Sequence, residues 1–178
     1  LDKQYSGYSA SLNLALKQAK GEYVCFVDGS DYLDPEALNK LYQAAQEFNP
    51  DVIQGSYSIV QSHPTKDPDL ATDRPIYTSA PIAPSRQVIS AKQQPSIFQT
   101  PAVIWSTLYR LDFIRENDIE FLPVIHDAST GGLSFAFKAL VLSHSTVLLP
   151  DILYYHYYSA MSATPTQSKA LTQEYEEI

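Results

Sequence analysis

The feature that most constrains this sequence is an apolar strand that runs directly into a helix and then into a second strand. Residues 22–27 are apolar with little alternation, which predicts a buried strand. Asp34 and Pro35 are typical of a helix start, and apolar side chains recur at helical spacing as far as Phe48. Residues 51–60 predict the next strand. This order implies an α/β fold in which the two strands are parallel neighbours.

Other periodic segments predict further helices and strands. Leu12, Leu16 and Ala19 fall on one helical face, and Gly21 ends that helix. Downstream, the pattern predicts a short helix over 111–117, an extended piece at 120–121, an apolar helix over 133–142, and strands over 146–149 and 152–158. Residues 163–178 are polar and favour a helical extension at the end of the chain.

Residues 61–103 differ from the rest of the chain. They are rich in Pro, Ser, Thr, Asp and Gln and show no sustained periodicity, apart from a short helix that we expect near Ser90. We therefore expect a long irregular loop. A loop of this length within one domain is usually functional or disordered.

Composition narrows the classes of partner. The formal net charge of −8 argues against a nucleic-acid partner, because a phosphate backbone needs a basic surface. Cys25 is the single cysteine, which excludes an intrachain disulfide and suits a cytosolic location. No apolar stretch approaches the roughly 20 residues that span a bilayer. The chain begins at Leu1 and not at Met, so we expect a piece of a longer protein.

An acidic turn follows the first predicted strand. Asp28 and Asp31 lie just beyond residues 22–27, at the strand end where ligands of α/β sheets bind. Two carboxylates there can hold a hard divalent cation, which in turn can bridge a nucleotide diphosphate to an acidic chain. The alternative is an acidic turn that only caps the helix beginning at Pro35.

Five segments, in the same order and spacing, resemble segments of family 2 glycosyltransferases. They are G-Y-S-A-S-L-N (7–13), A-K-G-E-Y-V (19–24), F-V-D-G-S-D-Y-L-D-P (26–35), I-W-S-T-L-Y-R-L-D-F-I (104–114) and L-Y-Y-H-Y (153–157). The resemblance implies an α/β fold of the GT-A type, in which helices flank a mixed sheet. It covers residues 1–162 as a partial domain that lacks the N-terminal nucleotide-binding strands of the family.

The same resemblance implies an enzyme that transfers a sugar from a nucleotide-diphospho-sugar to a glycan or lipid-linked acceptor, with inversion. It further implies a divalent cation, Mn²⁺ or Mg²⁺, a role in cell-envelope polysaccharide synthesis, and a cytoplasmic location at the inner face of the membrane. A homo- or hetero-oligomer is compatible with it. The alternative is a catalytically degenerate GT-A-like module that binds a glycan or a partner transferase.

Residue by residue, the resemblance assigns the donor site to the acidic turn. Asp28 matches the first aspartate of the family motif, which contacts the donor. Ser30 stands where the family has its usual metal ligand, and a neutral hydroxyl is a poor substitute for a carboxylate. Asp31 is then the candidate metal ligand, with His156 as a second one. For His156 the alternative is a histidine that packs among tyrosines.

The acceptor side departs further from the family. An inverting transferase needs a carboxylate that takes the proton of the attacking hydroxyl. Without a gap, the family's acidic pair falls on Gly131 and Gly132; with a gap, it falls on His126 and Asp127. Asp127 is thus the candidate base, and loss of the base is the alternative. Trp105 matches a residue that lines the acceptor site, and a purely structural role in the core is equally compatible.

Overall fold

The computed structural model describes residues 7–62, 73–78, 87–122 and 131–157, and every structural statement below concerns these residues. The expected helical extension over 163–178 lies outside them. The helices are α1 (Tyr8–Gln18), α2 (Ala37–Phe48), the 3-10 helix η2 (Pro95–Gln99), α3 (Leu111–Glu116) and α4 (Gly131–Leu142). The strands are β1 (Tyr23–Cys25), β2 (Tyr32–Leu33), β3 (Val52–Ser62), β4 (Asp73–Thr78), β5 (Thr107–Arg110) and β6 (Thr146–Tyr157).

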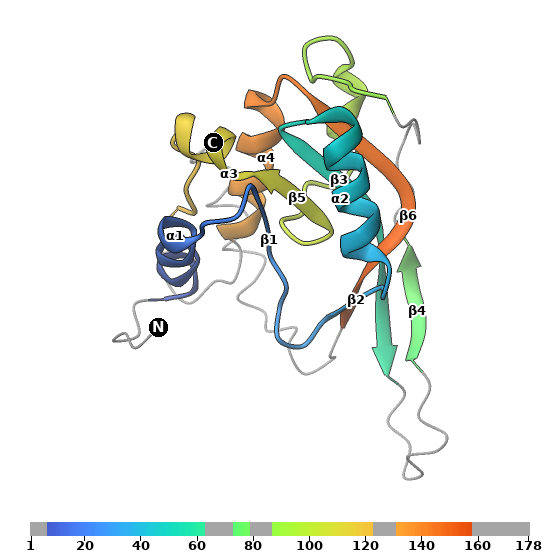
Figure 1. Cartoon of the computed structure of the whole chain (residues 1–178). Coiled ribbons are helices and arrows are strands. Elements are labelled where there is room, and N and C mark those ends of the chain that lie inside the picture. The colour runs from blue at the N-terminus through green and yellow to red at the C-terminus, as the bar shows by residue number, and fades with distance from the viewer. Residues whose placement is uncertain (1–6, 63–72, 79–86, 123–130, 158–178) are drawn as a thin grey trace.

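The strands form one six-stranded mixed sheet in the order β1-β5-β3-β6-β2, with β4 paired to β3 (Figure 1). Strands β3 and β6 are parallel, whereas every other pair is antiparallel. Together with the flanking helices, this confirms the expected α/β architecture with a mixed sheet.

The prediction that the first two strands are neighbours is wrong. Strand β5 lies between β1 and β3, where Tyr109 pairs with Val24 on one side and Val52 on the other. A strand-helix-strand order fixes strand direction, but the helix α2 is long enough to cross two strand spacings of about 4.8 Å each. Tyr109 is 1% exposed, so a segment from much later in the chain fills the central position.

The two strands predicted over 146–149 and 152–158 form a single strand, β6. Pro150 and Asp151 stay within it because the register with β3 shifts beside Gly55 and again after Ser56. A Cβ at Gly55 would lie 2.5 Å from the side chain of Leu153, so glycine permits the close approach of the two strands there.

Residues 61–103 are also more ordered than the sequence predicts. Strand β3 continues to Ser62, β4 pairs antiparallel with it, and η2 supplies a short helix. The short helix lies at 95–99, beyond the turn at residues 91–93. The proline-rich composition of this segment favours a loop, so it hides β4 from prediction. Pro75 fits in the strand because β4 pairs on one side only, where a missing N–H is tolerated.

Two apolar cores lie on opposite faces of the sheet. Helix α2 packs on one face against Ile53, Leu108 and Val147, whereas α1, α3 and α4 cover the other face. Neighbouring residues of a strand alternate between the two cores, as a pleated sheet requires. Ile53 and Leu108 belong to the core beneath α2, whereas Val52 and Tyr109 belong to the core on the other face. Burial on both faces explains why the strands read as apolar runs.

Candidate active site

A cleft of about 440 Å³ lies just beyond the end of β1. Its walls come from α1, the acidic turn, the segment before β5, the start of α4 and the end of β6. The lining residues are Tyr8, Phe26, Asp28, Asp31, Ala102, Val103, Ile104, Trp105, Gly132, Leu133 and His156. The cleft therefore brings together four of the candidate site residues predicted from the sequence: Asp28, Asp31, Trp105 and His156.

The acidic turn is closed by its own side chains. Asp28 accepts two hydrogen bonds on Oδ1, from the Ser30 backbone N–H at 3.1 Å and from the Ser30 hydroxyl at 2.9 Å. The backbone N–H of Asp31 donates to the carbonyl of Asp28 at 3.1 Å. Asp28 itself is exposed. The turn thus presents a carboxylate at the rim of the cleft, and Ser30 supports that carboxylate.

Asp31 faces the protein and not the solvent. Its side chain is 0% exposed. It accepts hydrogen bonds from the Tyr154 hydroxyl at 2.6 Å, from His156 Nδ1 at 2.9 Å and from the Tyr157 backbone N–H at 2.8 Å. Burial alone would raise the pKa of Asp31, but these three hydrogen bonds outweigh it and hold the pKa below its ordinary value.

The partners of Asp31 respond in turn. The hydrogen bond to Asp31 raises the pKa of His156 above its ordinary value, in spite of partial burial. Burial, followed by the contact with Asp31, raises the pKa of the Tyr154 hydroxyl. The same hydroxyl accepts the Asp28 backbone N–H at 3.1 Å, so it joins both ends of the acidic turn. Sequence patterns gave no sign of this role, because 126 residues separate Tyr154 from Asp28.

Trp105 is half-buried and belongs to both the core and the cleft. Its ring stacks on His156, with centroids 4.9 Å apart and planes inclined by 13°. It also stacks on Tyr154 at 5.1 Å and meets Tyr57 edge-on at 4.4 Å. The packing that holds the indole and its place in the cleft wall are therefore not exclusive alternatives.

The described residues do not fit a directly ligated cation. No group of three His, Cys, Asp or Glu side chains among them could hold a metal ion. The Asp31 carboxylate is engaged by three donors, and the Ser30 hydroxyl donates to Asp28.

Gly132 lies in the wall of the cleft, at the start of α4. It is one of the two positions onto which the family's acidic pair falls without a gap. A Cβ at Gly132 would approach Ile104 to 3.2 Å, so the site is tight for any side chain. The gapped candidates, His126 and Asp127, fall outside the described residues.

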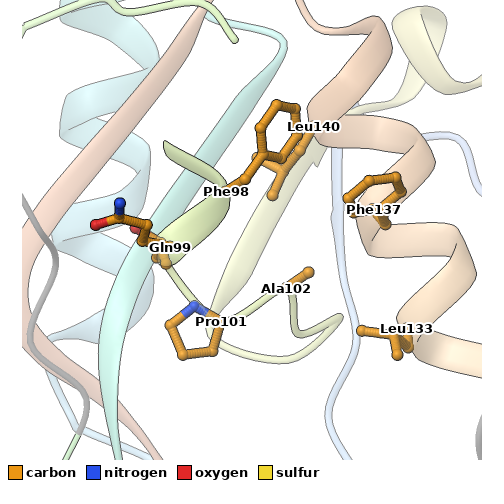
Figure 2. Close-up of a pocket in the computed structure, with 8 residues that line it drawn as sticks. Phe98, Gln99, Pro101, Ala102, Leu133, Phe137 and Leu140 are labelled. Atoms are coloured by element: carbon orange, nitrogen blue, oxygen red, sulfur yellow. The ribbon is translucent and has the colours of Figure 1, made fainter. Parts of the chain in front are cut away.

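A second cavity of about 560 Å³ adjoins the cleft. Ala102 and Leu133 line both hollows. Figure 2 shows its side chains arriving from two segments, residues 98–102 and α4. The rings of Phe98 and Phe137 lie 5.5 Å apart across it, so this extension of the cleft is mainly apolar.

A mixed sheet covered by helices on both faces, with an acidic turn beside a cleft at a strand end, defines a glycosyltransferase-like domain of the GT-A type. The model of the family described as glycosyl transferase family 2 matches residues 1–111, more than half of the chain. The chain therefore belongs to glycosyl transferase family 2.

Two glycosyltransferases of Staphylococcus aureus are similar to this chain in sequence. The chain is 26% identical over 165 residues to the poly(ribitol-phosphate) beta-N-acetylglucosaminyltransferase TarS of Staphylococcus aureus MW2, which covers 88% of this chain and 24% of TarS. It is 41% identical over 59 residues to TarP of S. aureus N315, covering 33% of this chain and 18% of TarP.

The fold is also similar to that of a solved glycosyltransferase structure. A crystal structure of S. aureus TarS 1-349 in complex with UDP-GlcNAc superposes with a TM-score of 0.70 at 22% identity, over 99% of this chain and 48% of that one. At this identity the superposition establishes the fold alone. The chain spans about a quarter of the full length of TarS. None of the helices in the described part of the chain is long and apolar enough to cross a membrane.

Proposed function

We propose that this chain forms the acidic-turn and acceptor-side part of an inverting glycosyltransferase. The sugar comes from a nucleotide-diphospho-sugar and passes to a hydroxyl group of a cell-envelope glycan. Membership of family 2 supports the reaction class. The relatives TarS and TarP, which carry the names of poly(ribitol-phosphate) glycosyltransferases, support a polymeric polyol or glycan acceptor. A lipid-linked acceptor and a cytoplasmic location at the inner face of the membrane belong to the same proposal.

The observation that carries the proposal is the cleft itself. It gathers Asp28, Trp105 and His156 from three segments, which are far apart in the sequence, around one hollow at a strand end. Ligands of open α/β sheets bind in such positions. A mainly structural turn would cap the next helix and nothing more. Asp28 instead stands exposed at the rim, where it can accept hydrogen bonds from hydroxyl groups of a donor.

The reaction assigns one task to each side chain. Asp28 positions the donor through hydrogen bonds to its ribose or sugar hydroxyl groups. Trp105 offers an aromatic wall for the acceptor, and its stacking on His156 holds the indole in place. As the acceptor oxygen attacks the anomeric carbon, the bond from that carbon to the diphosphate oxygen breaks and the nucleoside diphosphate leaves. Asp127 takes the proton of the acceptor hydroxyl.

A second function is favoured by the departures from the family motif. Ser30 donates its hydroxyl to Asp28 and offers no carboxylate, and Gly132 occupies the cleft wall without an acidic side chain. A GT-A-like module with these changes could keep the cleft and bind a glycan or a partner transferase without catalysis. Glycan binding that survives in the absence of any nucleotide binding would favour this alternative.

Calorimetric titration with UDP and UDP-GlcNAc separates the two. We expect the full-length protein to bind both, with an affinity about 10- to 100-fold lower in its Asp28→Asn variant, because a charged acceptor is replaced by a neutral one. Asp118→Asn is the matched control, since Asp118 is exposed and its φ of 48° suits asparagine. Equal affinity in Asp28→Asn and the wild type would remove Asp28 from the donor site.

A further inference from the structure

We propose that Asp31 is a positioning residue and not a cation ligand: its carboxylate ties the acidic turn to the end of β6 and fixes the His156 ring against Trp105, so that Nε2 is the ring nitrogen left for a ligand in the cleft. The inference goes beyond the proposed function. It relies on that function only for the identity of the ligand.

Backbone pairing places Asp31 at its partners. Strand β2 runs antiparallel to β6, with Tyr32 opposite Tyr155 and Leu33 opposite Tyr154. One step back along this register brings Asp31 to the level of His156. The rings of Tyr32 and Tyr155 stack at 4.8 Å with an angle of 13°, which holds the two strands together beside the turn.

The three donors on Asp31 leave it poorly suited to a cation. An ionised carboxylate has about four acceptor positions, and three are taken by Tyr154, His156 and the Tyr157 backbone. These are charge-assisted hydrogen bonds, which are stronger than neutral ones. Because the side chain is 0% exposed, a cation would have to displace donors that are themselves partly buried. The turn is therefore formed without one.

The same contacts define what His156 can do. Nδ1 faces Asp31 Oδ2 at 2.9 Å, so the hydrogen on Nδ1 is held by the carboxylate. Trp105 covers one face of the ring. His156 lines the cleft, and Nε2 is the nitrogen not engaged by Asp31. Its natural ligands are polar oxygens: hydroxyl groups, or phosphate oxygens when the ring is protonated.

The test is proton–nitrogen NMR of the four histidine side chains in the intact protein, with the His156 signals assigned from His156→Gln. We expect a protected Nδ1 proton on His156 in metal-free buffer, unchanged by millimolar Mg²⁺ and lost in Asp31→Ala, which offers no acceptor. Tyr154→Phe keeps the carboxylate but removes one donor, so it should retain the Nδ1 proton. His144→Gln is a control, because the hydrogen bond of His144 to Asp51 comes from its backbone.

Two results would overturn the inference. One is a wild-type spectrum in which Mg²⁺ removes the Nδ1 proton in a saturable manner, since that would mean that the cation takes the Asp31 carboxylate. The other is an Asp31→Ala protein that folds and keeps the Nδ1 proton. If Asp31→Ala does not fold, the wild-type titration alone decides. UDP should shift only the Nε2 signal, so absence of donor binding would count against the proposed function without changing the Nδ1 result.

Discussion

The indole of Trp105 lies flat on the imidazole of His156, with ring centroids 4.9 Å apart. The backbone next to Trp105 is held in an unusual conformation by strand β3. Ser106, the next residue, has a φ of 60°, and its hydroxyl donates to the carbonyls of Gly55 and Ser56 at 3.0 Å. Left-handed backbone at a serine is unfavourable, and these buried hydrogen bonds to β3 offset the cost.

This stack gives a direct optical signal, because Trp105 is the single tryptophan. The hydrogen bond to Asp31 raises the pKa of His156 above its ordinary value of 6.5, so the ring gains its proton as pH falls through a midpoint above 6.5. A protonated imidazole on the face of an indole should quench its emission. We therefore expect fluorescence to drop on acidification with that midpoint in the wild type.

The variants make this prediction specific. His156→Gln should show no transition, and His144→Gln, at an exposed histidine, should keep it. A midpoint below 6.5 in the wild type, or a transition that persists in His156→Gln, would contradict the arrangement of Asp31, His156 and Trp105.

The ion pair of Asp51 and Arg110 should be a main contributor to stability. The Asp51 side chain is 7% exposed and accepts hydrogen bonds from Arg110 and from the backbone N–H groups of His144 and Ser145. Asp51→Asn leaves Arg110 without its partner, and we expect a loss of about 3 kcal/mol in the free energy of unfolding by urea. Glu47→Gln, at an exposed helix position, should change it by less than about 0.5 kcal/mol.

The same pair predicts a pH dependence. Burial would raise the pKa of Asp51, but Arg110 and the backbone donors outweigh it, so the folded-state pKa lies below 3.8. The stabilisation is then fully present above about pH 3.8 and is lost as pH falls through the folded-state pKa. The gap in stability between wild type and Asp51→Asn should narrow only in that acid range. A gap that is constant down to pH 2 would contradict the assignment.

Substitutions at Asp127 and Gly132 test which residue is the catalytic base. If Asp127 takes the acceptor proton, Asp127→Asn should lower kcat about 100-fold or more, with little change in KM for the donor. Glu120→Gln, at an exposed carboxylate seven positions earlier in the sequence, is the control. An unchanged kcat in Asp127→Asn would place the base elsewhere. In that case Gly132→Asp, combined with Ile104→Ala to remove the side-chain atoms that lie 3.2–3.3 Å from the new Cβ, should raise the rate.

Local patterns were enough to predict most elements of the fold. Apolar side chains at helical spacing as far as Phe48 predicted α2, and Asn49 ends this helix with a φ of 43°. Adjacency in the sheet could not be predicted, because the insertion of β5 between β1 and β3 depends on pairing across more than 50 residues. Strand β4 was not predicted, because its single proline, Pro75, suits an irregular loop as well as a strand that pairs on one side.

The candidate site was likewise predictable only in part. Motif order identified Asp28, Trp105 and His156, and the structure places all three in one cleft. The orientation of Asp31 toward β6 was not predictable from an acidic motif. Residue type does not state whether a carboxylate faces solvent or a tyrosine hydroxyl that lies 123 positions away. The sequence likewise predicted only a packed strand residue at Tyr154, because its contact with Asp31 spans 123 positions.

The most direct test of the donor site is the release of UDP from UDP-GlcNAc in the presence of poly(ribitol-phosphate), measured for the full-length protein and for its Asp28→Asn variant. We expect acceptor-dependent release by the full-length wild type, a rate about 10- to 100-fold lower in Asp28→Asn, and a wild-type rate in Asp118→Asn. Equal rates in Asp28→Asn and the wild type would contradict the assignment of the cleft at Asp28 as the donor site.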